Sequence, residues 1–314
     1  MFQVLGLVLP LFSLILLGYL SGRWKKIPID GLAWLNYFIV YIALPALFFQ
    51  LLSKTPLEQF AQAQFLLYST GAALIIFALC FVIAKLRRSD TPEATIQALG
   101  GTYGNIGYLG PPLAMAAFGA EAGVPVALVF CVENSLYFII APLLMALGAR
   151  NKAKWFDTLR HILLSIFTHP FIVATLIAIA AAWAQWQPPP AIDKLLASLA
   201  AAAAPAALFA MGVTAALRPL KRVPAEAFYL VPIKLILHPL LAYLLLSFIP
   251  DLPQVWMLTA VLMASLPTAT NVFVLAQQYQ SWEQRASSIV VLSTVGSVVT
   301  VTLLLVWAVG LRGG

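Results

Sequence analysis

The segment that decides the fold spans residues 98–119 and reads "ALGGTYGNIGYLGPPLAMAAFG". It is apolar enough to lie in a membrane, yet Gly104, Gly110, Pro111 and Pro112 interrupt its middle. Proline removes a backbone donor and clashes with the preceding turn, and glycine lowers the cost of unwinding. Hydrocarbon offers no partner to the freed backbone groups, so such a break is tolerated only where it lines a cavity. The segment therefore predicts a broken membrane helix at a functional site.

A milder break of the same kind occurs near the other end of the chain, in "SLPTATN" at residues 265–271, around Pro267. When this segment is aligned with "GTYGN" at residues 101–105, identical polar residues fall at equivalent places: Thr102 with Thr268, and Asn105 with Asn271. Two interrupted spans at corresponding positions of two halves are the best sequence indication of a transport site.

The composition predicts a membrane protein throughout. Of the 314 residues, 62% are hydrophobic and only 9% are charged, whereas about a quarter of a soluble domain is charged. A spanning helix needs ~20 mostly apolar residues. Ten such stretches predict an all-α integral membrane protein, with spans near residues 2–22, 31–53, 65–86, 93–118, 124–148, 161–184, 194–217, 224–249, 254–279 and 285–311.

The basic residues alternate between loops. Fourteen follow the odd-numbered spans: Arg23, Lys25, Lys26, Lys85, Arg87, Arg88, Arg150, Lys152, Lys154, Arg160, Arg218, Lys221, Arg222 and Arg285. The opposite loops and the C-terminal end hold three: Lys54, Lys194 and Arg312. The positive-inside rule then places both termini on the outer side of the cytoplasmic (inner) membrane. Because the net charge of +7 is spread in this way and not gathered on one face, no nucleic-acid partner is expected.

The two halves of the chain resemble each other. "ALPALFF" around Pro45 resembles "AAPAALFA" around Pro205, at the same separation of 160 residues as Pro10 and Pro170. Each half has an odd number of spans, so the two are inserted upside-down relative to each other, as in secondary transporters. The predicted organisation is a first inverted repeat, a short cytoplasmic linker and a second repeat, at residues 1–149, 150–160 and 161–314. The alternative is that short Pro, Ala and Leu matches arise by chance in an apolar chain.

The broken spans favour an anion as the cargo. A half-helix that begins at a break presents unpaired N–H groups and the positive end of its dipole to the cavity. Asn105 and Asn271 add amide donors, and Thr102, Thr268 and Tyr103 can join them in holding a carboxylate without a fixed countercharge. The alternative is that these side chains cap the broken ends or bond between helices.

Three titratable residues inside predicted spans form a second candidate set, namely Glu133, Lys234 and His238. A charge at the centre of a membrane helix costs at least ~2.5–3.5 kcal/mol, so it usually has a function. Glu133 and Lys234 either line the pathway or form a structural pair, and His238 either shuttles protons or packs with a hydrogen bond. Coupling to a proton or sodium gradient therefore stays open.

No enzyme activity is expected, because the sequence holds no phosphate loop, His-based metal motif or nucleophile elbow. No cofactor or metal is expected either. Cys80 and Cys131 both fall within predicted spans and are expected to pack, not to form a disulfide framework.

Five segments carry a resemblance to a known family: "LPLFSLILLGYLSGRW", "YIALPALFF", "GNIGYLGPPLAMAAFG", "KLILHPLLA" and "SLPTATNVFVLAQQY". In this ordered set the chain resembles the auxin efflux carrier family, whose bacterial members include malonate and other carboxylate carriers. The resemblance implies ten helices in two inverted repeats, crossing fourth and ninth helices, an elevator movement of a transport domain against a scaffold, and a homodimer.

The resemblance also assigns residues. The crossover asparagines of the family correspond to Asn105 and Asn271, and its crossover prolines to Pro111 or Pro112 and to Pro267. Plant members have a long cytoplasmic segment between spans five and six, which is short here, so auxin itself is not assumed as the substrate.

The expected function is therefore a gradient-driven carrier of small carboxylates. A sodium- or proton-coupled antiporter, or a bile-acid-type symporter of the same general fold, is the alternative within the transporters. A membrane sensor that binds the ligand without moving it is the alternative outside them.

Overall fold

The computed structural model describes residues 2–24, 29–56, 58, 62–148, 155–217 and 223–312. The regular structure of this part of the chain is helical, and its named helices run as follows: α1 Phe2–Trp24, α2 Ile29–Phe38, η1 Ile39–Ala43, α3 Leu44–Leu52, α4 Ala63–Leu86, α5 Thr91–Thr102, α6 Gly110–Phe118, η3 Ala120–Ala122, α7 Gly123–Gly148, α8 Trp155–Phe167, α9 Pro170–Trp183, α10 Pro190–Leu217, α11 Ala227–Pro232, η4 Ile233–Leu237, α12 His238–Leu246, α13 Gln254–Ser265, α14 Thr270–Gln278 and α15 Glu283–Arg312.

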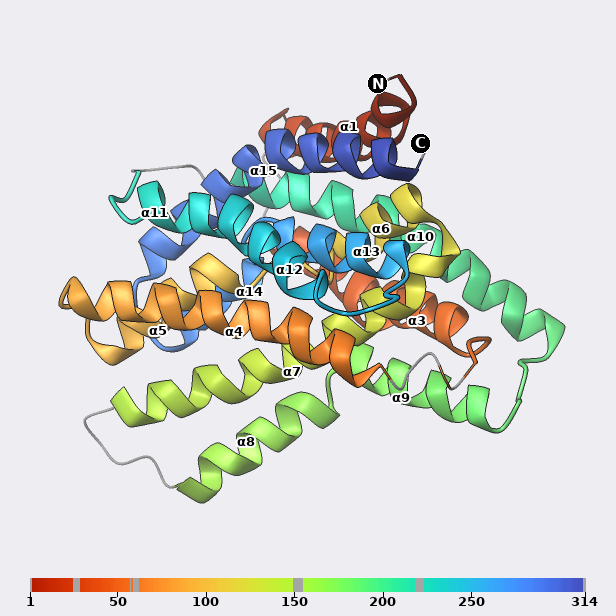
Figure 1. The fold of residues 1–314 in the computed structure, drawn as a ribbon, viewed down its shortest axis with the longest axis horizontal. Coiled ribbons are helices and arrows are strands. Elements are labelled where there is room, and N and C mark those ends of the chain that lie inside the picture. The colour runs from red at the N-terminus through yellow and green to blue at the C-terminus, as the bar shows by residue number, and fades with distance from the viewer. Residues whose placement is uncertain are drawn as a thin grey trace.

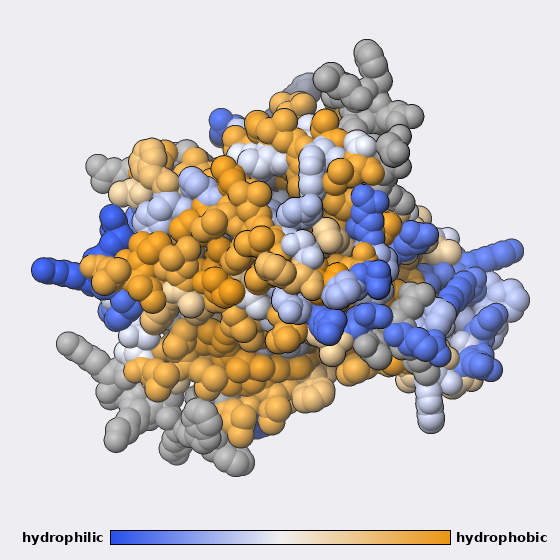
Figure 2. Space-filling model, in the orientation of Figure 1, coloured by the Kyte–Doolittle hydropathy of each residue, from blue (hydrophilic) through white to orange (hydrophobic). Residues whose placement is uncertain are grey.

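Many of these helices have the length and composition of membrane spans. In the part of the chain that is described, six helical stretches are long and apolar enough to cross a bilayer: Gly31–Leu52, Ala63–Leu86, Ala120–Gly148, Pro190–Leu217, Ala227–Leu246 and Glu283–Ala308. The space-filling view shows a broad apolar band with hydrophilic residues gathered toward two opposite ends (Figure 2). Apolar side chains that face outward over such a band are explained by lipid as the solvent.

Both predicted breaks are present. The helix expected over residues 93–118 is divided into α5 and α6, and the one expected over 254–279 into α13 and α14. A third division was not expected, since the span at 161–184 is split into α8 and α9 at His169. The helical region is disfavoured for the residue before a proline, and His169, which precedes Pro170, is extended with ψ of 122°.

Only part of the linker expected at residues 150–160 lies within the described residues. Residues 149–154 lie outside the described residues. The rest of the predicted linker, from Trp155 onward, is helical and forms the start of α8.

Two helices contain a π-helical turn just before a proline. η1 ends two residues before Pro45, and η4 ends two residues before Pro239. A proline ring clashes with the carbonyl of the fourth residue before it, and a wider turn gives that carbonyl room. These turns matter for the site, because η1 carries Val40 and η4 carries Lys234.

The helices pack as two bundles. In the first bundle α1 packs along α10, and α3 packs on α9 and α10. In the second bundle α4 packs on α5 and α12, α13 packs on α12, α7 and α15, and α14 packs on α15. Figure 1 shows α1 and α15 side by side, with α9 beside α3 and α4 beside α5.

Glycines allow the closest approach within the first bundle. A Cβ atom on Gly18 would lie 2.1 Å from the carbonyl oxygen of Phe209, and one on Gly212 would lie 1.9 Å from that of Ile15. α1 and α10 therefore meet backbone to backbone, which is the usual geometry of small-residue contacts between membrane helices.

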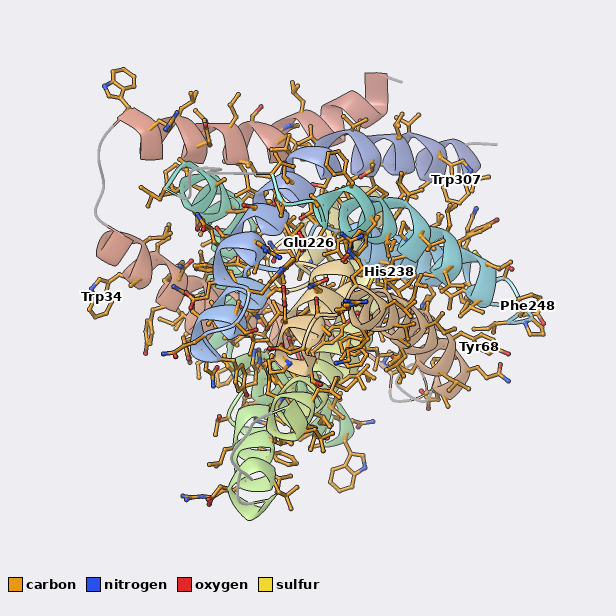
Figure 3. All side chains as sticks on the ribbon, turned by 90° about the vertical axis from the view of Figure 1, so that its left-hand side faces the viewer. Trp34, Tyr68, Glu226, His238, Phe248 and Trp307 are labelled. Atoms are coloured by element: carbon orange, nitrogen blue, oxygen red, sulfur yellow. The ribbon has the colours of Figure 1, made fainter. Side chains whose placement is uncertain are left out.

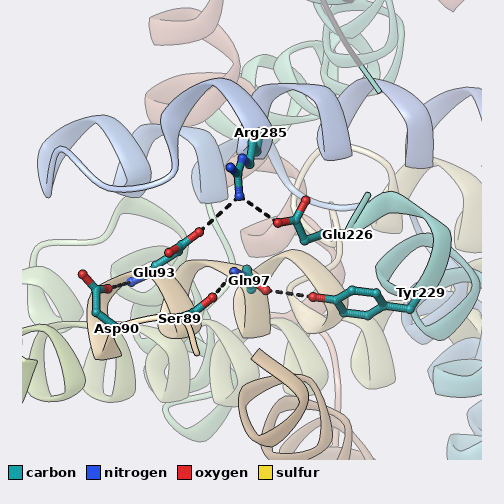
Figure 4. Close-up of polar contacts among 7 residues, drawn as sticks. All are labelled: Ser89, Asp90, Glu93, Gln97, Glu226, Tyr229 and Arg285. Atoms are coloured by element: carbon teal, nitrogen blue, oxygen red, sulfur yellow. Dashed lines mark hydrogen bonds and ion pairs between the residues drawn. The ribbon is translucent and has the colours of Figure 1, made fainter. Parts of the chain in front are cut away.

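The second bundle is closed at one end by a polar network (Figure 4). Arg285 at the start of α15 donates to Glu226 at 2.8 Å and pairs with Glu93 of α5 at 3.4 Å. Asp90 caps α5 by accepting the amide hydrogen of Glu93. The network therefore joins the starts of α5, α11 and α15.

The side-chain view separates the periphery from the interior (Figure 3). Trp34 and Phe248 point outward and are 78% and 64% exposed, whereas His238 lies inside at 1%. The start of α1 and the end of α15 lie on the same side of the molecule (Figure 1).

Candidate functional site

The two broken helices meet at their breaks. The amide of Asn105 donates to the carbonyl of Pro267 at 2.7 Å, and the amide of Ala269 donates to the carbonyl of Tyr103 at 2.8 Å. These reciprocal bonds form an isolated antiparallel bridge between Gly104 and Thr268. Each break thus supplies the backbone partners that the other one needs, which hydrocarbon cannot supply.

Glycine at position 104 permits this crossing. A Cβ atom there would lie 3.3 Å from Lys234 Nζ and 3.3 Å from the carbonyl oxygen of Met263. Gly110 leaves even less room, since its Cβ would lie 2.6 Å from Met263 Sδ. Pro111 and Pro112 follow in the first turn of α6, where a missing N–H leaves no helical bond unmade.

The two predicted threonines bind backbone carbonyls. Thr268 Oγ1 donates to the carbonyl of Gly100 at 2.7 Å, across the crossing, while Thr102 Oγ1 donates to Ala98 of its own helix at 2.8 Å. The amide of Thr268 donates in turn to Ser293 Oγ at 3.1 Å. Both threonine hydroxyls are therefore used within the protein, that of Thr268 between helices and that of Thr102 within its own helix.

A cavity lies beside the crossing, between the two bundles. It has a volume of about 110 Å³ and is lined by Val40, Tyr103, Gly104, Asn105, Ile106, Gly107, Tyr108, Phe130, Asn134, His169, Phe171, Ala269, Thr270 and Asn271. η1 and the start of α9 supply its wall on the first bundle. The two breaks and α7 supply its wall on the second bundle. Of the residues sequence analysis named, Asn105, Asn271, Tyr103 and Gly104 face this space, whereas Thr102 and Thr268 do not line it.

A chain of hydrogen bonds runs along the polar wall. Asn271 Nδ2 donates to Tyr103 Oη at 3.1 Å, and Tyr103 Oη donates to Asn134 Oδ1. Tyr103 also stacks on Tyr137, with ring centroids 4.4 Å apart. The tyrosine therefore fixes which way the amide of Asn134 points: its oxygen is bonded, and its Nδ2 has no partner although the residue is only 1% exposed.

Further donors come from the ends of the half-helices. α14 begins at Thr270, so Ala269, Thr270 and Asn271 bring the N-terminal end of a nine-residue helix to the cavity. Asn105 contributes a second amide, which makes only a weak contact of 3.7 Å with Met211 Sδ. Free N–H groups and the positive end of a helix dipole favour an anion at this position.

The opposite wall is aromatic. Phe130 of α7 lies 4.8 Å from Phe171 of α9 and 5.6 Å from Phe48 of α3, measured between ring centroids. His169 packs its ring near Phe130, Phe138 and Phe171, and its Nδ1 has no hydrogen-bond partner. The described lining contains no Asp, Glu, Lys or Arg.

Lys234 and His238 lie behind the crossing and not in the cavity. Lys234 Nζ donates to the carbonyl of Ala264 at 2.5 Å and lies 3.3 Å from His238 Nδ1. The Lys234 amine thus lies at the C-terminal end of α13, where the helix dipole stabilises a positive charge. Glu133 is buried on α7 within electrostatic range of Lys234, but among the described residues no ion pair joins the two.

Two residues of the site were missed by sequence reasoning. The sequence alone assigns no role to Asn134 or His169. Pro170 disfavours a helical conformation at His169, but this signal does not stand out, because Pro10, Pro142 and Pro205 lie inside helices of the same chain. Asn134 carried no signal, because a single polar residue on a membrane helix does not reveal which neighbour its side chain meets.

In the described part of the chain, no cluster of three His, Cys, Asp or Glu residues could hold a metal ion. Cys80 and Cys131 are both free thiols. Cys80 is buried and leaves no room for a side chain on Gly101, whose Cβ would lie 2.4 Å from its sulfur.

Comparison with known proteins finds one family model, described as "Membrane transport protein", that matches residues 3–305. A protein of Rhizobium meliloti (strain 1021) named "Putative malonate transporter" is 53% identical over 97% of this chain and 96% of its own length. The "Uncharacterized transporter YfdV" of Escherichia coli (strain K12) is 27% identical over 95% of this chain and 96% of its own. "Auxin efflux carrier component 7" of Arabidopsis thaliana is 31% identical over 39% of this chain and 20% of its own length.

Proposed function

Because this chain belongs to the auxin efflux carrier family of membrane transport proteins, we propose that it is a secondary carrier of a small organic anion, a carboxylate, in the cytoplasmic membrane. The observation that carries the proposal is the cavity at the crossing, where the amide of Asn271 and the start of α14 supply donors without a fixed countercharge. Neutral donors bind a carboxylate reversibly, and a carrier must release its cargo as readily as it takes it.

The amine of Lys234, which lies behind the crossing, supports the same cargo when it is protonated. Lys234 Nζ lies 3.3 Å from where a Cβ atom on Gly104 would be, and Gly104 itself lines the cavity. Electrostatic attraction is weakly screened in the interior of a protein. An anion in the cavity is therefore favoured by the ammonium without contacting it.

The size of the cargo is proposed from the relatives. The Rhizobium protein that shares 53% of its residues with this chain is named for malonate. A short mono- or dicarboxylate of this kind fits a polar wall that consists of amides and helix N–H groups, and the aromatic wall opposite excludes water from it.

We propose that the chain crosses the membrane ten times as two inverted repeats, with each broken helix counted as one span. The passes are α1, α2 to α3, α4, α5 to α6, α7, α8 to α9, α10, α11 to α12, α13 to α14 and α15. An even number of passes agrees with termini on one side of the molecule (Figure 1). The side is proposed to be the outer one, from the basic residues of the odd-to-even loops.

The proposed movement is of the elevator type. The second bundle holds both breaks and most of the cavity's polar wall, so it is the part that would carry the anion across. The first bundle, which supplies Val40, His169 and Phe171, would stay in place as the scaffold. A homodimer, which the family resemblance implies, would anchor it.

A coupled version of this carrier is the second candidate, and the buried set Glu133, Lys234 and His238 favours it. Titratable groups buried in a membrane protein often act as proton relays. Flux of [¹⁴C]malonate into proteoliposomes, measured with sodium removed and with the proton gradient collapsed, decides between a uniporter and either type of coupling.

The direct test replaces Asn105 and Asn271 by alanine, singly. We expect uptake of carboxylates into proteoliposomes to fall at least tenfold, because hydrogen bonds to a charged group contribute about 1.5–3 kcal/mol each. Asn36→Ala is the matched control, since Asn36 lies on α2 and does not line the cavity. Unchanged transport by both variants, with the protein present in the membrane, would reject this site.

A further inference from the structure

The wall that the first bundle contributes to the cavity contains one polar side chain, that of His169. Its neighbours in the same wall, Val40 and Phe171, are apolar. Every other polar side chain of the described lining, including Asn105, Asn134 and Asn271, comes from the second bundle. The histidine is thus the one hydrogen-bonding side chain that the proposed scaffold offers to the cargo.

The geometry leaves His169 with a hydrogen-bonding atom to spare. Its Nδ1 is buried and has no partner, and its side chain does not cap α9 although it stands at the N-cap position. A buried polar atom without a partner costs free energy, and a ligand that forms a hydrogen bond with it recovers part of that cost. An imidazole with its hydrogen on Nδ1 can donate to a carboxylate.

A second unpaired donor lies on the other side of the same cavity. Asn134 is 1% exposed, and Tyr103 holds its amide so that Nδ2 is the end without a partner. Both residues line the cavity, whose volume is about 110 Å³, several times what one water molecule needs. The two side chains therefore border a common space from two different bundles.

We propose that His169 is a one-sided substrate contact, made with the carboxylate only while the cavity lies in the position described here. The inference rests on the proposed function and on its elevator movement. Asn134 and Asn271 belong to the second bundle and travel with the cargo, so they hold it on both sides of the membrane. His169 stays with the first bundle, so the contact is broken when the second bundle moves.

A contact present in one state alone has a defined consequence. A ligand that binds one conformation more tightly shifts the population toward it. His169 therefore raises the affinity at one membrane face and leaves the affinity at the other face unchanged. The carrier is asymmetric for this reason, although its crossing is built from two similar halves.

The test measures KM for [¹⁴C]malonate at each face, in proteoliposomes reconstituted in one orientation, by uptake for one face and by efflux for the other. His169→Phe keeps the aromatic packing against Phe130 and Phe138 and removes both ring nitrogens. We expect KM to rise roughly tenfold at one face and less than twofold at the other. His169→Asn places an amide where Nδ1 was and should restore most of the loss.

Two controls make the result specific. Asn271→Ala should raise KM at both faces, because its residue travels with the cargo. Thr168→Val should change neither, because the Thr168 hydroxyl bonds to the carbonyl of Leu164 in α8, at 2.6 Å. Equal effects of His169→Phe at both faces, or no effect at either, overturn the one-sided contact.

The same experiment separates this inference from the function it rests on. Wild-type protein that carries malonate while His169→Phe behaves like wild type leaves the proposed function intact and refutes the role of His169. Wild-type protein that neither binds nor carries any carboxylate refutes both.

Discussion

Replacing Thr268 by valine tests whether the crossing depends on a bond between the two broken helices. Valine has nearly the same shape as threonine but lacks the hydroxyl that donates to the carbonyl of Gly100 at 2.7 Å. The hydrogen bond from the backbone amide of residue 268 to Ser293 Oγ remains, because the backbone is unchanged. The substitution therefore removes one hydrogen bond between residues 168 positions apart and leaves the rest of the site in place.

The expected cost follows from what is left behind. Thr268 is 1% exposed, and the carbonyl of Gly100 would lose this hydrogen-bond donor inside the protein. A buried acceptor without a partner costs about 1–3 kcal/mol. Because 1.4 kcal/mol corresponds to a factor of ten, the equilibrium constant for forming the crossed arrangement would fall roughly fivefold to more than a hundredfold.

The assay is thermal unfolding of the purified protein in detergent, followed by tryptophan fluorescence, together with malonate uptake. Thr259→Val is the matched control, because Thr259 is fully buried on α13 and its hydroxyl has no partner. We expect Thr268→Val to lower the apparent Tm by several degrees and to reduce uptake, and Thr259→Val to leave Tm unchanged or raise it. If the two variants behave alike, the bond across the crossing is not what holds the breaks together.

Two further substitutions test the packing and the polar end. Gly212→Ala should cost about 1–3 kcal/mol or more, because its Cβ would lie 1.9 Å from the carbonyl oxygen of Ile15 and the two helices must separate; Gly71→Ala, with nothing within 4 Å, should be neutral or stabilising by the same thermal assay. Arg285→Gln should lower the free energy of unfolding by less than about 1 kcal/mol, and by less still in high salt, because the arginine is 54% exposed. A loss of Tm as large as that of Gly212→Ala would show that the network at the start of α15 contributes more to stability than its exposure implies.

The helices themselves could be predicted because their signals are local. A run of apolar residues long enough for a bilayer depends on nothing elsewhere in the chain, and α4 and α15 lie close to the expected spans at 65–86 and 285–311. The break around Gly104 could be predicted for the same reason, since glycine and proline change the backbone at their own positions. The division before Pro170 could not be singled out in this way, because Pro10, Pro142 and Pro205 lie inside helices although the same preference acts on the residues before them.

The different hydrogen-bonding roles of the polar residues could not be predicted. Thr268 and Asn271 are three residues apart, yet the first bonds to the carbonyl of Gly100 and the second to Tyr103 in the cavity wall. Both partners lie 168 residues away in sequence. Sequence alone gave the two side chains the same role, since their local surroundings are alike.

By itself the sequence determined that this protein lies in a membrane, where its helices run and where two of them break, because hydropathy and backbone chemistry act within one turn of each residue. Only the tertiary structure decided that the breaks pair with each other, that Lys234 lies behind the crossing, and that Asn134 and His169 line the same cavity. The physical reason is that a hydrogen bond is satisfied or left open by whichever groups packing brings within about 3 Å, and in this chain those groups come from different helices.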